Sequence, residues 1–379
     1  MKFYPILTTI SASMLIRAAL AQTDGPGTSY ALPADPLGSP TTLATTTPNG
    51  RTAGGEPFAI GLSLYWENDG NFAKPNNSTD RDYSAGTGTA IQWQSPQTTA
   101  LVGQIPSINN EFSDCAPDTS FSMGVVLSLN IYTPKNITDP NPIYDQHPYA
   151  GWTSAGVIFQ RANRNAKLPT FEHIEWDIGT IGPSGQSGMA QRTVHRTFGY
   201  TDPQGWDNQI RDEIGADFKY LRRWRVDLAG PVNSPWLQVL PEAGFVLGTM
   251  HLNASAGATL RAGWNMPDDF GPGRMRYAND FTRPFGRTNP IENVGAYAFI
   301  RTSGHVVAHD STIQGSYFRS SPVVLDQEVF TAEIQAGAAI EFLKHIELAY
   351  SQTYTSPEFI GQNGWDSYGA ISLTMVYTW

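Results

Sequence analysis

The stretch Gly369-Ala370-Ile371-Ser372-Leu373-Thr374-Met375-Val376-Tyr377-Thr378-Trp379 at the end of the chain alternates in polarity. In an extended strand, one face would carry only apolar side chains, those of Ile371, Leu373, Met375, Tyr377 and Trp379. The other face would carry Ser372, Thr374, Val376 and Thr378. This period of two predicts a β-strand with two chemically different faces. A half-buried strand of a soluble sheet has this pattern, and so does a barrel strand between lipid and a polar lumen.

Both ends of the chain favour the barrel. A final strand that finishes on an aromatic residue, here Trp379, is typical of bacterial outer-membrane barrels. At the other end, a short basic start, an apolar run and the small residues Ala19-Leu20-Ala21 predict a signal peptide over residues 1–21. No other stretch approaches the roughly 18 consecutive apolar residues of a spanning helix. The exported chain is therefore soluble or a closed barrel, since only helices and barrels pair every backbone polar group in lipid.

Composition agrees with an all-β domain. The chain has 36 glycines, and its charged fraction of 15% is well below the usual quarter. A single cysteine, Cys115, excludes an intramolecular disulfide, so the sheet must supply the stability. The net charge of −10 argues against nucleic acid as a partner. Residues 22–55 lack periodicity and predict a disordered periplasmic leader, followed by one barrel domain over residues 56–379.

Twelve segments of that domain have the length and alternation of tilted membrane strands. They are Phe58–Trp66, Tyr83–Trp93, Met123–Tyr132, Trp152–Gln160, Glu172–Gly179, Ala216–Leu228, Trp236–Leu247, Ala256–Trp264, Val294–Ser303, Val329–Ala338, Glu341–Ser351 and the terminal strand. The predicted fold is a transmembrane antiparallel β-barrel of about twelve strands. The long segment 267–290 is unexpected, because parity places it on the periplasmic side, where connections are usually short.

Strand parity also brings distant polar residues to one rim. With a periplasmic N-terminus, the first strand rises and places Asn68 and Asp69 at the extracellular rim, and Ser84 begins the descending second strand. The fifth strand rises to Gly179, so the segment 181–215 is extracellular too. Within it, residues 188–198 can form a short helix. Gln191 and His195, four residues apart, would share one face of that helix.

These residue types suggest hydrolysis of an ester. Asp69, Asn68 and Ser84 offer the hard oxygen ligands that calcium prefers. A metal and a histidine together can activate water against an ester carbonyl, with His195 as general base and Gln191 orienting water, substrate or the histidine. A second mechanism makes Ser84 a nucleophile activated by His195. Arg192 and Arg196 flank His195, and they are either phosphate ligands or solvated helix charges.

The chain resembles the outer-membrane lipid A deacylase family from about residue 58 to its end. The motifs that carry the resemblance are Glu67-Asn68-Asp69; Asp80-Arg81-Asp82-Tyr83-Ser84-Ala85-Gly86; Ile131-Tyr132-Thr133-Pro134; His147-Pro148-Tyr149-Ala150-Gly151-Trp152; Asp177-Ile178-Gly179-Thr180-Ile181-Gly182-Pro183; Gln191 with His195; and Gly205-Trp206-Asp207-Asn208-Gln209. Each motif alone is weak evidence, whereas their order along the chain is specific.

The resemblance implies a twelve-stranded barrel in the outer membrane of a Gram-negative bacterium. It implies a calcium-dependent carboxylic ester hydrolase that removes the 3′-linked acyloxyacyl chain of lipid A in the lipopolysaccharide of the outer leaflet. Residue by residue it carries over Asn68, Asp69, Ser84, Gln191 and His195 as an active site that faces the outside. We also expect the barrel-assembly machinery to insert the chain.

The sequence departs from the family pattern at three places. Ser84 replaces a threonine. The loop 139–148 lacks a family lysine, for which Lys135 is a possible substitute, and Thr201 with Asp202 stands where the family has an acid. Two other functions remain open on the sequence alone, an outer-membrane phospholipase or esterase and a barrel without catalysis. A soluble secreted sandwich is the alternative fold.

Overall fold

The computed structural model describes residues 58–70, 80–105, 119–164, 167–231, 234–274, 294–343 and 345–378. The predicted signal peptide (residues 1–21) and leader (residues 22–55) lie outside the described residues, as does Cys115. In the ranges just given, no helix has both the length and the apolar character needed to span a membrane.

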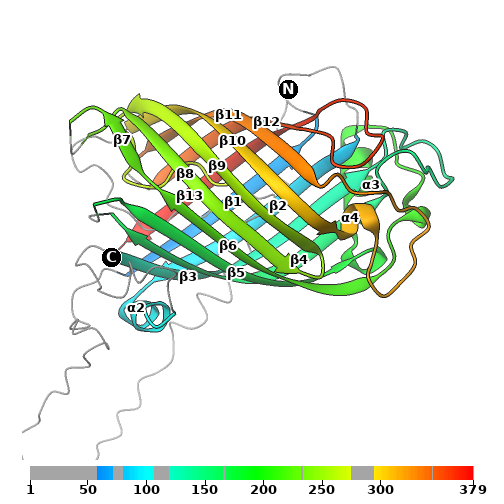
Figure 1. Cartoon of the computed structure of the whole chain (residues 1–379), viewed down its shortest axis with the longest axis horizontal. Coiled ribbons are helices and arrows are strands. Elements are labelled where there is room, and N and C mark those ends of the chain that lie inside the picture. The colour runs from blue at the N-terminus through cyan, green and yellow to red at the C-terminus, as the bar shows by residue number, and fades with distance from the viewer. Residues whose placement is uncertain are drawn as a thin grey trace, which may run out of the picture. The chain divides into compact units, whose positions relative to one another are not determined.

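The strands form one closed antiparallel sheet (Figure 1). They are β1 (Ala59–Asn68), β2 (Asp82–Gln94), β3 (Thr119–Thr133), β4 (Ala150–Asn163), β5 (Thr170–Ile181), β6 (Glu213–Trp224), β7 (Val226–Ala229), β8 (Leu237–Gly248), β9 (His251–Trp264), β10 (Val294–Asp310), β11 (Phe330–Phe342), β12 (Ile346–Thr355) and β13 (Asp366–Thr378). β1 pairs with β13, and β6 pairs with β8. Because β7 continues β6 along β8 after Arg225, the two count as one strand. The predicted twelve-stranded barrel is confirmed.

Short helices lie at the two ends of the barrel. They are α2 (Pro96–Val102), η1 (Pro183–Gly185), α3 (Ser187–Phe198), η2 (Trp206–Asn208) and α4 (Ser311–Gln314). α2 lies at one end, and α3 and α4 lie at the other (Figure 1). We call these the α2 end and the α3 end. β1, β3 and β5 all end at the α3 end, as parity predicts.

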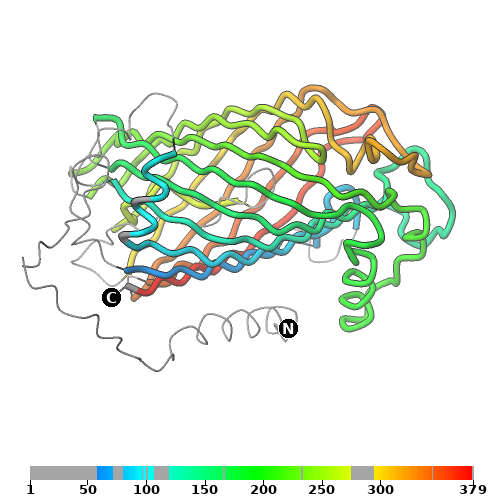
Figure 2. The backbone as a smooth tube through the Cα atoms, turned by 90° about the horizontal axis from the view of Figure 1, so that it is seen from below, coloured from blue at the N-terminus to red at the C-terminus, as the bar shows by residue number. Residues whose placement is uncertain are grey.

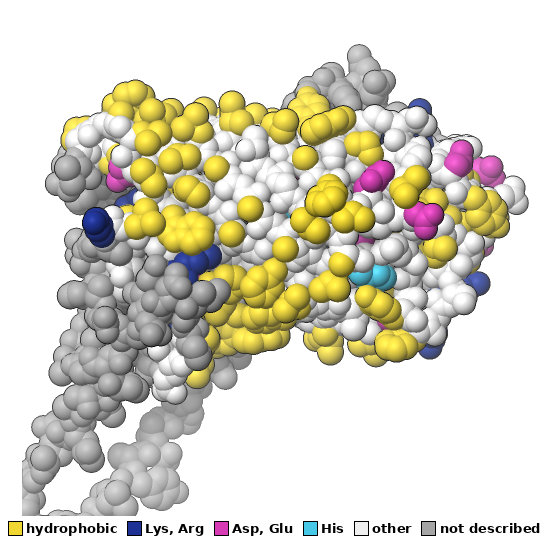
Figure 3. All heavy atoms as spheres, in the orientation of Figure 1, with side chains coloured by type: hydrophobic (Ala, Val, Ile, Leu, Met, Phe, Trp, Pro, Cys, Tyr) yellow, Lys and Arg dark blue, Asp and Glu magenta, His cyan; other side chains and the backbone are white. Residues whose placement is uncertain are grey.

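Each strand has an apolar outer face and a polar inner face. Outward side chains such as Ile178, Ile214 and Ile300 are 63%, 75% and 55% exposed. The strand wall in Figure 3 is accordingly covered mostly by hydrophobic and uncharged side chains. On the inner face of β13, the Thr374 hydroxyl is buried and lies 3.1 Å from that of Ser63. This is the arrangement of a membrane barrel, with lipid outside and polar groups inside.

A loop closes the lumen near the α2 end. Residues 265–274 follow β9 and fold back into the barrel, where Arg223 donates to the carbonyl of Phe270 (3.0 Å). Arg261 binds Asp269, and the Arg301 guanidinium binds the carbonyl of Pro272. Tyr65, from another part of the wall, donates to the carbonyl of Gly273 (3.4 Å). The described part of the long segment 267–290 thus lies inside the lumen.

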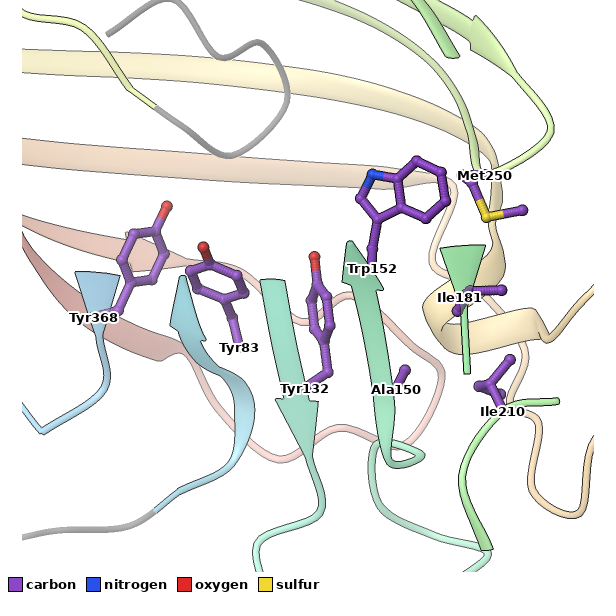
Figure 4. Packing of buried hydrophobic residues seen from close by; sticks show 8 residues of the cluster. All are labelled: Tyr83, Tyr132, Ala150, Trp152, Ile181, Ile210, Met250 and Tyr368. Carbon is purple, nitrogen blue, oxygen red and sulfur yellow. The ribbon is translucent and has the colours of Figure 1, made fainter. Parts of the chain in front are cut away.

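Aromatic side chains fill the lumen near the α3 end. Tyr83, Tyr132, Trp152 and Tyr368 project inward from neighbouring strands in one buried cluster (Figure 4). The Tyr83 ring lies 4.9 Å from that of Tyr368, edge-on. Its hydroxyl donates to the carboxylate of Glu67 (2.5 Å). These contacts fix the ends of β1 and β2, from which several candidate site residues come.

One predicted turn was misplaced. The sequence predicted a break between Ala338 and Glu341, but β11 runs on to Phe342 and the chain turns at Leu343, whose φ is 55°. Alanine has a low intrinsic strand preference, so the run 336–339 suggested an interruption. In the barrel, these alanines pair with β10 and β12 without a break.

Arg261→Ala should destabilise the barrel. The guanidinium is fully buried and also donates to Gln238 (2.7 Å), so its removal leaves the Asp269 carboxylate without this partner in the lumen. We expect a loss of about 3–5 kcal/mol in the free energy of unfolding, the usual effect of breaking a buried ion pair. Urea unfolding of the barrel in detergent measures it. Arg319→Ala, at an exposed arginine, is the control. Equal stability of the two variants would contradict the assignment.

Candidate active site

Helix α3 packs against the outside of the barrel wall. Val157 of β4 is exposed and points outward, so Gly151 and Thr153, in step with it, also point outward. A side chain at Gly151 would meet Ser187 of α3, with only 1.9 Å from an added Cβ to Ser187 Oγ. The Thr153 hydroxyl donates to the carbonyl of Gly185 just before α3 (2.7 Å). In Figure 2, the green helix accordingly lies beside the barrel and outside its wall.

Trp206 fixes the position of α3. Its indole N–H donates to Gln191 Oε1 (2.8 Å), and its ring lies 5.0 Å from that of Tyr149. Both rings belong to an apolar cluster with Ile131 of β3, and Ala190 of α3 packs against it. A Cβ at Gly188 would lie 2.8 Å from the indole, so a glycine is needed for this close approach. The helix is therefore fastened to the wall by a tight, mostly apolar interface.

The end of α3 places an acceptor on His195. Gly199 adopts a left-handed conformation (φ 74°) and ends the helix, and the next amide, that of Tyr200, donates to the carbonyl of His195 (2.8 Å). The reversal brings the carbonyl of Thr201 back to His195 Nδ1, at 2.5 Å. This hydrogen bond fixes the orientation of the imidazole ring.

Asp80 holds the other side of the ring. His195 Nε2 lies 3.1 Å from Asp80 Oδ2, and both side chains are at most one-tenth exposed. Burial lowers the pKa of His195. The hydrogen bond to Asp80, the Thr201 carbonyl and the charges of Asp80 and Asp202 outweigh this effect and raise the pKa above its ordinary value. His195 therefore readily holds a proton.

Asp69 lies close to the same carboxylate. It follows β1 directly, is only 7% exposed, and accepts from the backbone amide of Arg81 (3.0 Å). Its own amide donates to the carbonyl of Ser84 (3.1 Å). Burial and the charge of Asp80 raise the pKa of Asp69 well above its usual range. Two largely buried acids thus repel one another at this rim, as in a site suited to a cation.

Asn68 and Ser84 complete this rim. Asn68 points outward, in step with the exposed Trp66, and its Nδ2 donates to the carbonyl of Ser84 (3.3 Å). Ser84 is the extra residue of a β-bulge, because the pairing of β2 with β3 shifts between Tyr83 and Ala85. Its hydroxyl lies 2.6 Å from that of Thr133. Bulges often occur next to active sites, where they redirect a side chain.

The predicted residues thus form two groups. Asn68, Asp69 and Ser84 contact one another, and Asp80 joins their rim to His195. Gln191 lies one turn before His195. Its Nε2 is buried and has no hydrogen-bond partner among the described residues. Among the described residues, no hydrogen bond connects Ser84 with His195.

Sequence reasoning missed four contributors to the site, namely Asp80, Thr133, Thr201 and Trp206. Asp80, Thr133 and Trp206 stand within motifs already quoted, so the signal was present. Thr201 acts through a backbone carbonyl, for which no sequence signal exists. Asp202, at the position of the departure noted above, pairs with the exposed Arg196 (2.8 Å). Lys135 is exposed.

The family model for outer membrane protein LpxR matches residues 37–377. The chain belongs to this family. Among solved structures, LpxR from Salmonella typhimurium is similar, with 17% identity and a TM-score of 0.65 over 83% of this chain and 99% of that one. This likeness supports the fold of an outer-membrane barrel, and the predicted family and outer-membrane location are confirmed.

Other barrels resemble the chain more distantly. The β domain of the Bordetella autotransporter BrkA has 10% identity and a TM-score of 0.41, over 85% of this chain and 98% of that one. The translocator domain of NalP from Neisseria meningitidis has 8% identity and a TM-score of 0.40, over 85% and 88%. A comparison with curated protein sequences gives no match.

Gly151→Ala should loosen α3 without unfolding the barrel. The new methyl group would occupy the space of the Ser187 side chain, so the helix must move away from the wall. We expect faster hydrogen exchange of the amides of α3, measured by mass spectrometry, with unchanged exchange in the strands. Gly304→Ala, on β10 with open space at its Cβ, is the matched control. Unchanged exchange of α3 in Gly151→Ala would show that the contact is not tight.

Asp80→Asn should lower the pKa of His195. The substitution removes a charge and a charge-assisted hydrogen bond, while burial continues to disfavour the imidazolium. NMR titration of the imidazole, assigned with His195→Gln, measures the pKa. Asp202→Asn is the control and should lower the pKa less, because Asp202 contributes only through its charge. Equal shifts in the two variants would contradict the central role of Asp80.

Proposed function

We propose that the protein is a lipid A 3′-O-deacylase, which hydrolyses the ester of the 3′-linked acyloxyacyl chain. Membership of the LpxR family supports the coarser role of an outer-membrane lipid A deacylase. The observation that carries the finer proposal is the position of His195. It is a buried histidine, held at both ring nitrogens and placed beside Asp80, on the outer wall of a membrane barrel. A lipid could reach this site from the bilayer without entering the lumen.

His195 is proposed to be the general base. The Thr201 carbonyl accepts the hydrogen of Nδ1, which leaves Nε2 to take a proton from the attacking water. The imidazolium formed in this step keeps both of its acceptors, the Thr201 carbonyl and the Asp80 carboxylate. These two contacts stabilise the protonated ring, in agreement with its raised pKa. The Thr201 carbonyl at Nδ1 has the position of the supporting acid in hydrolytic triads, whereas Asp80 lies at Nε2, the nitrogen that takes the proton.

The rim suits calcium through its hard oxygens. Among the described residues, no three His, Cys, Asp or Glu side chains converge as a metal site, so neutral oxygens would have to complete the ligand set. Asp69, with Asn68 and Ser84, would hold the ion, and the nearby Asp80 adds negative charge. Burial raises the pKa of Asp69 most, and the charge of Asp80 adds to this effect; a bound cation would offset the repulsion between the two carboxylates. When bound, calcium would supply positive charge that stabilises the oxyanion of the transition state.

Gln191 is proposed to orient the water or the substrate. Trp206 occupies its Oε1, so the buried Nε2 remains as a donor. Water attack is preferred to attack by Ser84, because the Ser84 hydroxyl is engaged with Thr133. In the Ser84 mechanism, His195 would instead have to deprotonate that hydroxyl.

A phospholipase or esterase of the outer membrane is the second candidate. A site on the outer wall is open to any lipid of the same leaflet, and the chain geometry does not select a headgroup. We place the α3 end outside the cell, where lipopolysaccharide lies, and we expect the barrel-assembly machinery to insert the chain. The orientation of the barrel and its insertion by this machinery are both proposed here.

Lipid A from Gram-negative cells that express the protein tests this function. Mass spectrometry should show loss of the 3′-acyloxyacyl group with the wild type. His195→Ala should reduce the loss by at least 100-fold, since a general base contributes roughly 10²–10⁴ in rate. A chelator should also prevent the loss, whereas Ser84→Ala should retain part of it.

Three outcomes would contradict the proposal. Full activity of His195→Ala would overturn the site. Hydrolysis of phospholipid with unchanged lipid A would favour the second candidate. A folded, inserted barrel that leaves both lipids unchanged would favour a role without catalysis.

A further inference from the structure

A groove of about 640 Å³ runs across the outer wall on β9–β13. Its lining residues are almost all apolar, and most come from the outward face of the wall. The volume lies within the range of small-molecule binding pockets. Because this wall belongs to the membrane-facing part of an outer-membrane barrel, the groove opens toward acyl chains rather than water.

Side-chain size creates the groove. Its floor is a row of alanines, Ala262, Ala298 and Ala338, which pair with one another on adjacent strands. Larger side chains of the two neighbouring rows form its edges. One edge is Leu260 with Ile300, and the other is Trp264 with Ile340 and Leu348, all between 42% and 57% exposed. Alanines between two such rows leave a channel about one side chain deep.

The strand register leads this channel toward the candidate active site. In register with these alanines stand Tyr350 and Ile371, which line the upper end of the groove, and then Trp66 of β1, two residues before Asn68. The next row reaches Asn68 itself, and its partner there is Gly369, which has no side chain to obstruct the way. The groove itself ends at Ile371, whose partner Trp66 stands between it and Asn68.

The direction of the groove fits a lipid that is held at one rim. Trp66 lies near the α3 end of β1, whereas Ala262 lies near the opposite end of β9. The row therefore descends from the α3 end into the membrane-spanning wall. Five steps between neighbouring strands of ~4.8 Å each give a path of roughly 24 Å. At its upper part, the Tyr350 hydroxyl donates to Gln352 (3.2 Å), so polarity returns near the site.

We propose that this groove binds the acyl chain of the lipid whose ester lies at His195. The proposal rests on the proposed deacylase function and adds to it a site for the chain that is released. An extended apolar chain matches a narrow, apolar groove whose upper end, at Ile371, lies one strand away from Trp66. A chain seated there would hold the ester at the rim and would make cleavage depend on chain length.

Photolabelling tests the groove without requiring turnover. The probe is lipid A with a diazirine at the end of its 3′-linked chain, added to folded His195→Ala protein in phosphatidylethanolamine vesicles. Peptides of β9–β11 should carry at least ten times more label than the same peptides exposed to a phosphatidylethanolamine probe with the same diazirine. Even labelling around the barrel, or equal labelling by the two probes, would overturn the proposal.

Filling the groove tests its role in specificity. Ala298→Leu and Ala338→Leu should each reduce labelling of β9–β11 and slow cleavage of long-chain lipid A at least tenfold, but should not slow cleavage of lipid A with a four-carbon 3′ chain. Ala256→Leu, at an exposed alanine elsewhere on β9, should change neither. Equal rates on both chain lengths in the two filled variants would overturn the groove. Labelling of the groove without cleavage by the wild type would instead overturn the deacylase function alone.

Discussion

Closure of the sheet is the constraint on which the rest of this structure depends. In lipid, every strand N–H and C=O must be paired, so β1 must meet β13 and β6 must meet β8. Closure fixes which side chains face lipid and which face the lumen. It also gathers the ends of β1, β3 and β5 at one rim. Asn68 ends β1 and Asp69 follows it, and the α3 segment follows the end of β5, so strand closure brings them to the same rim.

Charged side chains lie both in the lumen and on the outer wall of the barrel, and the two groups have different roles. Inside, Arg223, Arg261 and Arg301 hold the loop 265–274 across the barrel. Outside, His195 of α3 pairs with Asp80, and Asp80 interacts in turn with Asp69 at the end of β1. Burial and the charge of Asp80 raise the pKa of Asp69, whereas the hydrogen bonds to Asp80 and Thr201 raise the pKa of His195 against the effect of burial.

The sequence predicted the barrel well because alternation and strand parity are local signals with global consequences. Residues 369–379 reveal their lipid face directly, and the helix over 188–198 agrees with α3 within one residue. The predicted turn near Ala338 was wrong because alanine has a low intrinsic strand preference even where it faces the membrane. Around the site, parity placed Asn68, Asp69 and Ser84 at one rim. It could not reveal that Asp80 contacts His195, that Thr201 contributes a carbonyl, or that α3 lies outside the wall. Those facts depend on how a loop packs, through Gly151, Gly188 and Trp206.

The central claim is that hydrolysis occurs on the outer wall, where α3 meets the ends of β1 and β2. A crystal structure of His195→Ala with calcium and intact lipid A tests it most directly. The account predicts that the 3′ ester lies between Asp69 and the position of the lost imidazole, with the ion at the Asp69 carboxylate. A substrate found inside the lumen, or at the α2 end, would contradict it.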